Sequence, residues 1–489
     1  MPAVTALNAQ PLIPYAFAKA HSVLVWRSAK GLHLGATALT PRSALAEIAR
    51  QHGAYTLQTL DSDAFAQAVQ SQYGQSSLQG SAQSVADAAG QELDLNRLMD
   101  DIPEVQDLLD SAADAPIIKL INALLTQAVR EGASDIHIEP FEAATVVRLR
   151  VDGTLRDIAR PKRSLHAALV SRIKIMANLD IAERRLPQDG RMALRVAGRP
   201  VDVRVSTLPV GSAANAAQGA ERAVLRLLDK SEARLDLTAL GMAAPTRAAV
   251  DALIKQPYGI VLVTGPTGSG KTTTLYSAIK RLDASTTNIL TVEDPIEYEL
   301  AGIGQTQVNA KIDLNFATAL RAILRQDPDV VMIGEIRDVE TASIAVQASL
   351  TGHLVLATLH TNDAVGAVTR LTDMGVEPFL LSSSLIGVVA QRLVRKLCTA
   401  CKVLQPDGRY KPSGCAACNH TGYSGRLGIY ELLTIDPALA EAIHQRLPEA
   451  QLRSMAQARG LMSLRQDAQR LIDSGETSEA EVERVTRLG

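Results

Sequence analysis

The chain has 489 residues, of which 46% are hydrophobic, 21% are charged and only 3% are aromatic, a composition typical of globular domains with aliphatic cores. Its net charge of −2 gives no basic field that would hold it on nucleic acid, and no apolar run reaches the ~18–20 residues that span a bilayer. Because the N-terminus also lacks the basic start and apolar block of a signal peptide, we expect a cytoplasmic protein that meets a membrane only through a partner.

The length predicts three or four domains at roughly 150 residues each. Residues 1–71 are expected to form a small α/β domain, with short strands at 23–26 and 31–35 and a helix at 41–50 whose apolar residues recur at helical spacing. Residues 72–112 are expected to form a linker, because the stretch 72–90 is rich in Ser, Gln, Gly and Ala and nearly free of charge.

A second, α+β domain is predicted over residues 113–234. It would begin with an apolar helix at 115–125, followed by strands at 135–138, 146–151 and 201–205, of which the last two alternate apolar with charged residues. Asp152 and Gly153 predict a turn directly after the second of these strands. The small-residue stretch 211–220 predicts a loop.

The pattern changes over residues 235–395. Apolar segments at 260–263, 289–292, 330–333 and 354–357 alternate with helical segments, which is typical of a parallel sheet covered by helices on both faces. Residues 396–428 then hold all four cysteines, and residues 429–489 are expected to form a helical C-terminal region. The chain is therefore predicted to be a multidomain α/β protein.

A phosphate-binding loop follows the first of those apolar segments. Its pattern is G-x-x-x-x-G-K-[ST], in which glycines let backbone N–H groups close around phosphate at the start of a helix. Lys271 is expected to reach the β- and γ-phosphates of ATP, and Thr272 to bind Mg²⁺. The alternative is a chance Gly-rich turn, but the complete motif between a strand and a helix favours a RecA-like nucleotide site. The predicted nucleotide-binding residues are Gly265, Pro266, Thr267, Gly268, Ser269, Gly270, Lys271, Thr272 and Thr273.

Carboxylates at two other strand ends are candidates for handling Mg²⁺ and the attacking water. Glu335 follows the apolar segment 330–333, where a water-activating group is expected beside a P-loop. Glu293 follows the segment 289–292 within a small cluster of acids, at the edge where doubly wound sheets bind ligands. The alternatives are a solvated glutamate at a strand end and an ordinary acidic turn.

Basic side chains are candidates for contacts with the γ-phosphate. His360 follows the segment 354–357 at a point where a γ-phosphate sensor would be useful, although a histidine beside a strand is more often structural. Arginines are dense before the P-loop, Arg204 and Arg226 among them, and a guanidinium from another domain or subunit can stabilise a transferring phosphoryl group. Most of these arginines are nevertheless expected to lie on solvated strand faces or in salt bridges.

The cysteines form two C-x₂-C pairs, Cys398 with Cys401 and Cys415 with Cys418. Thiolates at this spacing close a tetrahedral Zn²⁺ site, and a site with four protein ligands is structural. A redox pair or an iron–sulfur cluster is the alternative. The metal would let a subdomain fold whose own core is too small to hold it.

These segments together resemble the secretion ATPase superfamily and, within it, the type II secretion ATPase family. The resemblance runs over nearly the whole chain, from the Pro-Tyr-Ala-Phe-Ala-Lys segment at 14–19 to the paired cysteines. From the P-loop onward, residues 291–297, 325–338 and 351–360 are similar to the family's aspartate box, second nucleotide motif and histidine box, in that order.

The resemblance implies a Mg²⁺-dependent homohexameric ATPase on the cytoplasmic face of the inner membrane, which drives assembly of a periplasmic pseudopilus and export of folded proteins. The first domain would be an adaptor that binds the cytoplasmic domain of the L-type membrane protein, and the F-type platform protein is a further candidate partner. Glu335 would be the catalytic glutamate, Glu293 the key acid of the aspartate box, and Arg204 and Arg226 the phosphate-facing arginines of the second domain. No nucleic-acid partner is expected.

Two features depart from the family pattern. Residues 209–221 contain a small-residue insertion in which Ala220 replaces a glycine, which alters the surroundings of Arg226 more than those of Arg204. The gap between the cysteine pairs is also short, which makes the expected zinc subdomain smaller.

Rival interpretations remain. The type IV pilus assembly ATPase shares the motor and is the nearest rival, but residues 14–19 and 302–308 favour type II secretion. The pilus-retraction ATPase generally lacks the zinc module and the first domain. A nucleic-acid translocase conflicts with the near-neutral charge, and an ATP-binding scaffold would be expected to lack Lys271 or Glu335.

Overall fold

The computed structural model describes residues 12–13, 17–18, 21–28, 31–61, 64–65, 68, 114–196, 199–211, 220–229 and 235–486. The chain divides into two compact units, Met1–Lys230 and Ser231–Gly489. The expected linker at 72–112 and most of the expected loop at 211–220 lie outside the described residues. No helix of the described part is long and apolar enough to cross a membrane.

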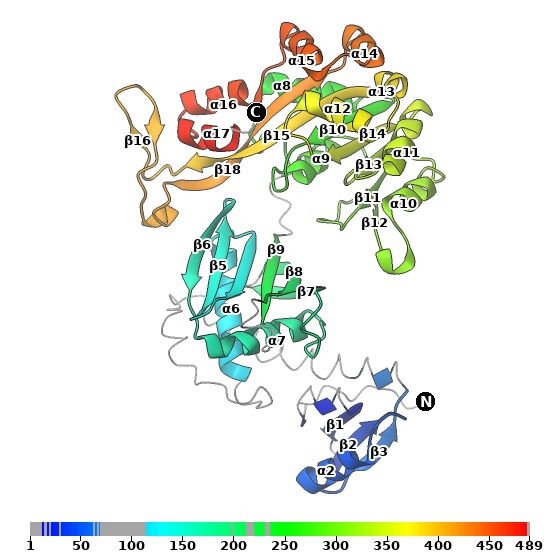
Figure 1. Ribbon diagram of the computed structural model, residues 1–489, viewed down its shortest axis with the longest axis vertical. Coiled ribbons are helices and arrows are strands. Elements are labelled where there is room, and N and C mark those ends of the chain that lie inside the picture. Colours follow the sequence, from blue (N-terminus) through cyan, green and yellow to red (C-terminus); the bar gives the residue numbers. More distant parts are fainter. Residues whose placement is uncertain are drawn as a thin grey trace. The chain divides into compact units, whose positions relative to one another are not determined.

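The smaller sheet of the first unit has three strands in the order β1-β2-β3 (Figure 1). β1 (Val23–Ser28) and β2 (Gly31–Ala36) are antiparallel, and β3 (Thr56–Thr59) joins β2 in parallel after the helix α2 (Arg42–His52). The apolar residues of α2 pack with those of β1 and β2 into one core that includes Ile48, Val25 and Leu34. The strands and the helix predicted for this region are confirmed.

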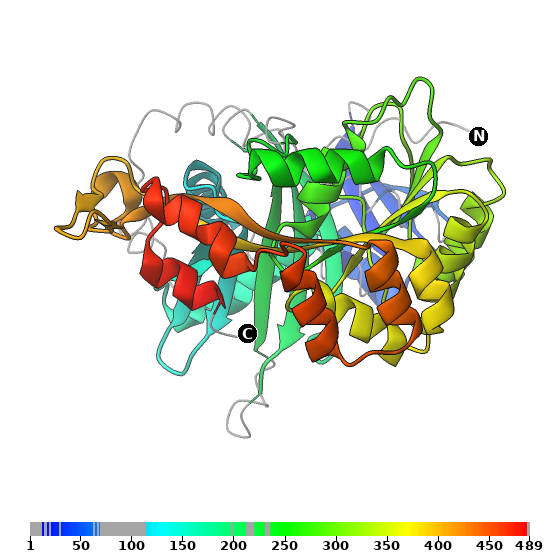
Figure 2. The ribbon, with the colours of Figure 1, turned by 90° about the horizontal axis from the view of Figure 1, so that it is seen from above.

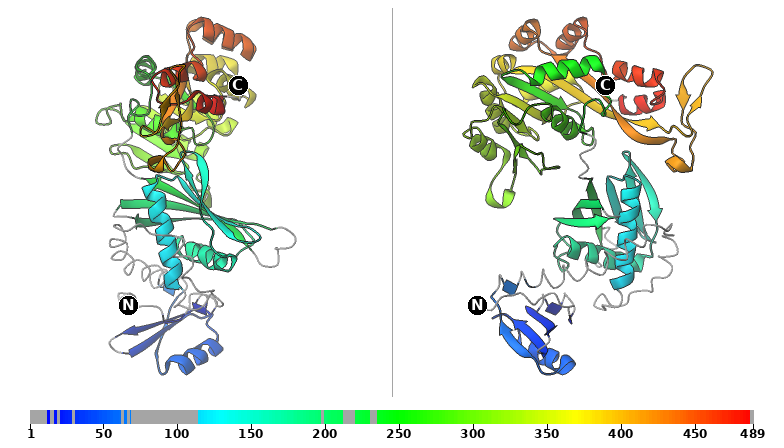
Figure 3. Two further views of the ribbon diagram at one scale, coloured as in Figure 1. Left: turned by 90° about the vertical axis from the view of Figure 1, so that its left-hand side faces the viewer. Right: turned by 180° about the vertical axis from the view of Figure 1, so that it is seen from behind.

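The larger sheet of the first unit is antiparallel, in the order β6-β5-β4-β9-β8-β7. Its strands are β4 (Asp135–Pro140), β5 (Thr145–Val151), β6 (Thr154–Ala159), β7 (Gln188–Val196), β8 (Arg199–Pro209) and β9 (Glu221–Asp229). The helices α6 (Asp114–Arg130) and α7 (His166–Met176) share a core with it, and Figure 3 shows α6 (cyan) running along the sheet. Asp152 and Gly153 join β5 to β6 with φ values of 48° and 82°, as the predicted two-residue turn requires.

The second unit is built on a seven-stranded sheet in the order β12-β11-β13-β14-β10-β15-β18. The strands are β10 (Gly259–Thr264), β11 (Ile289–Glu293), β12 (Gly304–Gln307), β13 (Val330–Ile333), β14 (Leu354–Leu359), β15 (Leu385–Leu397) and β18 (Tyr423–Thr434). All neighbours are parallel except the antiparallel pair β15 and β18. Every residue of β10, β13 and β14 is buried, because a parallel strand covered on both faces needs an uninterrupted apolar run.

Helices cover both faces of this sheet. The helices α8 (Ala244–Ile254) and α9 (Lys271–Ile279) pack with Val261 and Val263, whereas Ile260 and Leu262 point to the opposite core. Figure 2 shows α8 (green) and the helices α14 and α15 (orange) on opposite sides of the strands. The helices that contribute to the second core are α10 (Phe316–Ile323), α11 (Val339–Leu350), α12 (Ala364–Asp373), α13 (Pro378–Ser384), α14 (Pro437–His444) and α15 (Glu449–Ala458).

The cysteine-bearing segment is inserted between two strands of the same sheet. It connects β15 to β18, carries the short pair β16 (Val403–Leu404) and β17 (Tyr410–Lys411), and lies at the far end of the long β15–β18 ribbon (Figure 1). The expected boundaries at 395/396 and 428/429 therefore fall inside strands. Residues 429–434 were expected to begin a helical region but belong to β18, because their apolar side chains complete the pairing with β15. The helices α16 (Leu464–Asp473) and α17 (Glu479–Thr486) pack on the ribbon.

Candidate functional site

The predicted phosphate-binding loop connects β10 to α9. β10 is the strand between β14 and β15, so the loop emerges at the carboxyl edge of the parallel sheet, where ligands bind in such folds. Two of its glycines are required by the approach of β15. A Cβ on Gly265 would lie 2.5 Å from the backbone oxygen of Gln391, and a Cβ on Gly270 would lie 2.9 Å from the Gln391 side chain. Both glycines also have positive φ.

Lys271 is the first residue of α9, and its side chain reaches back to the backbone of the loop. Its Nζ donates to the backbone oxygens of Gly265, at 2.8 Å, and Pro266, at 3.1 Å. Burial lowers the pKa of Lys271 to about 8, against a smaller opposing effect of the nearby Glu335 carboxylate. The ammonium group therefore lies where it could exchange carbonyl oxygens for phosphate oxygens.

Glu335 and His360 join Lys271 at the ends of adjacent strands. Glu335 follows β13, His360 follows β14, and β14 is the direct neighbour of β10. His360 Nδ1 is 3.5 Å from Lys271 Nζ, and His360 Nε2 is 3.6 Å from the Glu335 carboxylate. Glu335 also pairs with Arg337. Burial, helped by the charge of Lys271, lowers the pKa of His360, so the neutral imidazole is favoured.

Glu293 lies at the end of β11 but is enclosed by structural partners. Its carboxylate accepts hydrogen bonds from the hydroxyl of Tyr276 on α9, from Thr291 Oγ1 at 2.6 Å and from Gln305 Nε2 at 3.0 Å. The Glu293 side chain is buried among these donors. Through these hydrogen bonds Glu293 links the P-loop helix α9 to β11 and β12.

Arg204 and Arg226 belong to the first unit, not to the unit that carries the P-loop. They are opposite each other on β8 and β9, and Arg226 Nε donates to Asp135 Oδ1 on β4 at 2.8 Å. The neighbouring Arg222 pairs with Glu139 at 2.7 Å. Each described contact of Arg222 and Arg226 is thus made within their own sheet.

Several polar residues beside the loop were not predicted from the sequence. Gln391 accepts a hydrogen bond from Thr274 of α9 at 2.7 Å, and the next residue, Arg392, donates to Asn362 in the segment that follows His360. The available signal was a Gln-Arg pair that interrupts the otherwise apolar residues 385–394. Without knowing that this strand lies beside β10, the pair had no obvious role.

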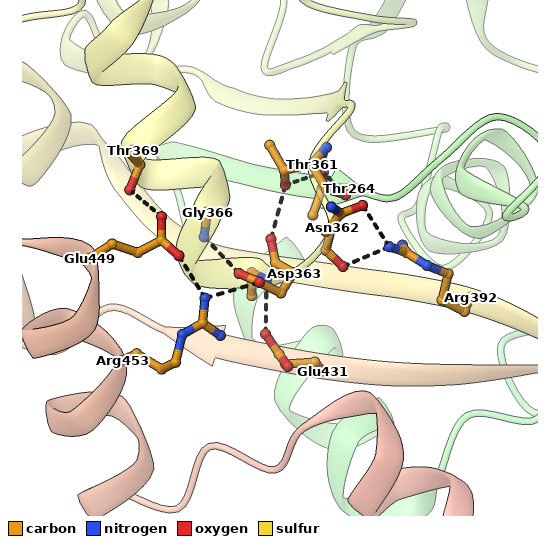
Figure 4. A network of polar contacts seen from close by, with 11 residues as sticks. Thr264, Thr361, Asn362, Asp363, Gly366, Thr369, Arg392, Glu431, Glu449 and Arg453 are labelled. Carbon is orange, nitrogen blue, oxygen red and sulfur yellow. Dashed lines mark hydrogen bonds and ion pairs between the residues drawn. The ribbon is translucent and has the colours of Figure 1, made fainter. Parts of the chain in front are cut away.

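A polar network fixes the segment 361–363 that leaves β14 (Figure 4). Thr361 N donates to Thr264 Oγ1 at 2.9 Å, at the end of the P-loop strand. Asp363 caps α12 by accepting from the backbone of Gly366 at 2.8 Å, and it pairs with Arg453 of α15 at 3.0 Å. The segment is therefore anchored to β10 on one side and to a C-terminal helix on the other.

The four cysteine side chains converge at the end of the β15–β18 ribbon. All four Sγ atoms lie within 4.8 Å of one another. The Sγ separations are 3.9 Å for Cys398–Cys415 and 3.8 Å for both Cys401–Cys418 and Cys415–Cys418. Zn–S bonds of about 2.3 Å give a tetrahedron with edges of about 3.8 Å, so the cysteines fit a four-coordinate zinc site.

Backbone groups support negative charge on these sulfurs. Gly422 N and Cys415 N donate to Cys418 Sγ at 3.2 Å and 3.3 Å. Burial raises the pKa of the Cys418 thiol, but the two N–H donors and the hydrogen bonds with the Cys401 and Cys415 thiols together lower that pKa to about 6. Burial instead raises the pKa of the Cys401 thiol to about 11. Because a thiolate is the form that binds metal, these donors suit Cys418 to a metal centre, and the convergence of the four sulfurs supplies the other ligands.

Comparison with known proteins identifies the family to which the chain belongs. Residues 110–484 match the family model described as Type II/IV secretion system protein, and residues 12–73 match the model of an N-terminal domain of GSPII protein E. The chain is 62% identical over 476 residues to the type II secretion system protein HxcR of Pseudomonas aeruginosa, covering 97% of this chain and 99% of that protein. It is 57% identical over 410 residues to the type II secretion system ATPase E of Vibrio cholerae, covering 81% of this chain and 80% of that protein.

A solved structure is also similar. The crystal structure of the pilus retraction motor PilT with bound ADP matches with a TM-score of 0.53 and 28% identity, over 75% of this chain and 96% of that chain. From the family model and the long, highly identical alignments, the chain belongs to the Type II/IV secretion system protein family.

Proposed function

We propose that this chain is the ATP-hydrolysing motor of a type II secretion system, which couples hydrolysis to pseudopilus assembly and to export of folded proteins across the outer membrane. The proposal rests on one observation above all: Lys271, Glu335 and His360 meet at adjacent strand ends, with separations of 3.5 Å and 3.6 Å, beside a complete phosphate-binding loop. Relatives that align over nearly the whole chain carry type II secretion names, which supports the choice of system.

In this proposal the backbone N–H groups of residues 265–270 and the ammonium of Lys271 bind the phosphates of ATP. Thr272 and a carboxylate would hold Mg²⁺, which when bound neutralises charge on the β- and γ-phosphate oxygens. Glu335 would orient the attacking water and accept its proton. His360, which lies between Lys271 and Glu335, would sense the γ-phosphate through its neutral imidazole.

The remaining assigned residues act around this centre. Arg204 and Arg226 would approach the γ-phosphate from the second domain of the same or a neighbouring subunit, and Arg226 would have to leave Asp135 to do so. Glu293 would act on a Mg²⁺-bound water only if it exchanged its present donors. In its enclosed position it would instead set the orientation of α9.

The proposal includes the wider assembly. The chain would form a homohexamer on the cytoplasmic face of the inner membrane, held there through the cytoplasmic domain of the L-type membrane protein and in contact with the F-type platform protein. Residues 1–71 would be the adaptor, 72–112 the linker, 113–234 the arginine-bearing domain, and 235–395 the ATPase core. The cysteine-bearing subdomain would bind one structural Zn²⁺ per chain.

Pull-down experiments with the full chain test the assignment of the system. The type II L-type cytoplasmic domain is expected to be retained, and the corresponding partner of type IV pilus assembly is not. The match of residues 12–73 to a GSPII protein E domain favours this outcome over the pilus assembly ATPase. Retention of the pilus partner alone would overturn the secretion assignment while leaving the motor assignment intact.

A further inference from the structure

Arg392 lies beside the phosphate-binding loop although it is distant in sequence. It belongs to β15, whose Ala390 pairs with Thr264, the last residue of β10. Gln391 and Arg392 therefore continue past the point where β10 ends and run alongside the loop that starts at Gly265. Arg392 is only 9% exposed, so its charge is held inside the molecule rather than on its surface.

The guanidinium group of Arg392 donates hydrogen bonds to uncharged oxygen atoms. Its Nη1 donates to the backbone oxygen of Gln391 at 3.1 Å. Its Nη2 donates to both the backbone oxygen of Asn362, at 2.9 Å, and the Asn362 side-chain oxygen, at 3.2 Å. Within the described residues no carboxylate lies within 4.0 Å of it. Burial lowers the pKa of Arg392, whereas Asp363 and Glu431 act on it in the opposite sense from longer range.

A buried arginine that donates hydrogen bonds to both the main chain and the side chain of one residue fixes the position of that residue. A planar guanidinium suits this task because its N–H groups point in set directions, which the ammonium of a lysine cannot reproduce. Asn362 lies two residues after His360, in the segment 361–363 that leaves β14 (Figure 4). Arg392 therefore holds in place the segment that directly follows His360, the candidate γ-phosphate sensor.

The segment has a second anchor that does not depend on Arg392. Thr361 is bonded to Thr264, and Asp363 is bonded to Arg453 and to the backbone of Gly366. Loss of Arg392 should therefore leave the segment attached and the unit folded. It should change only how closely His360 is held against Lys271 and Glu335, where the present distances are 3.5 Å and 3.6 Å.

We propose that Arg392 is a positioning residue for ATP hydrolysis, which orients His360 at the γ-phosphate by gripping Asn362. The inference rests on the proposed ATPase function and adds a residue to it. Because Arg392 would act on the geometry of the reacting groups and not on the phosphate-binding loop itself, it should influence kcat more than nucleotide affinity.

The test compares three variants of the full chain with the wild type: Arg392→Lys, Asn362→Ala and, as the matched control, Arg395→Lys. Arg395 is on the same strand but pairs with Glu481, away from the loop. Steady-state ATP hydrolysis gives kcat and KM, binding of a fluorescent ADP analogue gives affinity, and thermal unfolding reports folding. The Lys271→Ala variant sets the background rate.

Arg392→Lys is expected to lower kcat about 10- to 100-fold, in the range that small misplacements of reacting groups produce, with KM and ADP affinity within about threefold of wild type. Asn362→Ala is expected to lower kcat about threefold or more and to add little when combined with Arg392→Lys, because both changes remove the same contact. Arg395→Lys is expected to keep the wild-type kcat, even if its melting temperature falls.

Wild-type kcat in the folded Arg392→Lys variant would overturn the inference, and so would a loss confined to KM, which would make Arg392 a direct phosphate ligand. If Arg392→Lys fails to fold, Asn362→Ala decides, because Asn362 is exposed and its side chain can be shortened without opening a cavity. A wild-type kcat in the Asn362→Ala variant would then contradict the inference. A wild-type chain that does not exceed the Lys271→Ala background would instead refute the proposed function itself.

Discussion

The Glu335 carboxylate lies between two basic side chains, Arg337 and His360, and is 15% exposed. A carboxylate in this position can accept a proton from water once the phosphate groups occupy the loop. In the proposed mechanism Glu335, and not the loop alone, would therefore decide whether bound nucleotide is hydrolysed.

Glu335→Gln is expected to retain nucleotide binding and to lose turnover. The amide keeps the shape of the side chain but cannot accept the proton, so kcat should fall by about 100-fold or more while the Kd for an ADP analogue stays within about threefold. Glu441→Gln, on the exposed face of α14, is the control and should behave as wild type. Hydrolysis by Glu335→Gln at the wild-type rate would rule out the assigned role.

Lys271 is expected to make nucleotide affinity depend on pH. Burial lowers the pKa of Lys271 from 10.5 to about 8, so the free protein loses this positive charge as the pH rises through about 8, and the form that attracts phosphate is fully present only below that value. The Kd of an ADP analogue should therefore rise between pH 7.5 and 9.5, by up to about tenfold per pH unit above the pKa. Lys271→Arg keeps its charge and should show a flatter profile; an equally flat profile in the wild type would contradict the prediction.

At the scale of elements, the β15–β18 ribbon serves two purposes. Its sheet end packs β15 against the P-loop strand, and its far end carries the cysteines. A segment this short, with the exposed side chains of Val403 and Leu404 on β16, has little apolar core of its own. A metal would supply the missing stabilisation.

Removal of zinc is expected to destabilise the ribbon end and leave the ATPase sheet folded. Metal analysis of the purified full chain should give about one zinc per chain, and chelation or Cys415→Ser should lower the melting temperature by about 5 °C or more. Ser413→Ala, a change on the same segment that replaces no ligand, should leave both the zinc content and the melting temperature unchanged. A folded preparation without metal, whose melting temperature does not respond to chelator, would contradict the zinc assignment.

At the scale of the whole molecule, the residues of the proposed mechanism come from two units. The phosphate-binding loop lies in Ser231–Gly489, whereas Arg204 and Arg226 lie in Met1–Lys230. If Arg204 and Arg226 contact a bound γ-phosphate as proposed, ATP binding would be coupled to movement of the unit that carries them, as a motor requires.

Arg226→Gln is expected to lower kcat by about 100-fold or more if the arginine stabilises the transferring phosphoryl group. Arg160→Gln is the control, since Arg160 pairs with Asp157 on the exposed edge strand of the same sheet. Mixing Arg226→Gln with Lys271→Ala subunits should restore part of the activity when the arginine acts between subunits. Wild-type kcat in Arg226→Gln would remove it from the proposed mechanism.

Much of the fold could be predicted from the sequence because its signals are local. The apolar runs of β10, β13 and β14, the Asp152–Gly153 turn and the glycines of the P-loop each specify their own backbone conformation. The end of β18 could not be recognised in the same way, since residues 429–434 become a strand only through pairing with β15.

The sequence by itself determined that a phosphate-binding loop, a carboxylate after β13 and four metal-competent cysteines exist, because each is encoded by neighbouring residues. Only the tertiary structure decided which groups share a site. Thr264 and Thr361 are bonded across 97 positions of sequence, and Asn362 and Arg392 across 30. The strand order β13-β14-β10-β15 differs from the order in the chain, so burial of the shared apolar faces, and not local preference, brings Arg392 to the loop and encloses Glu293.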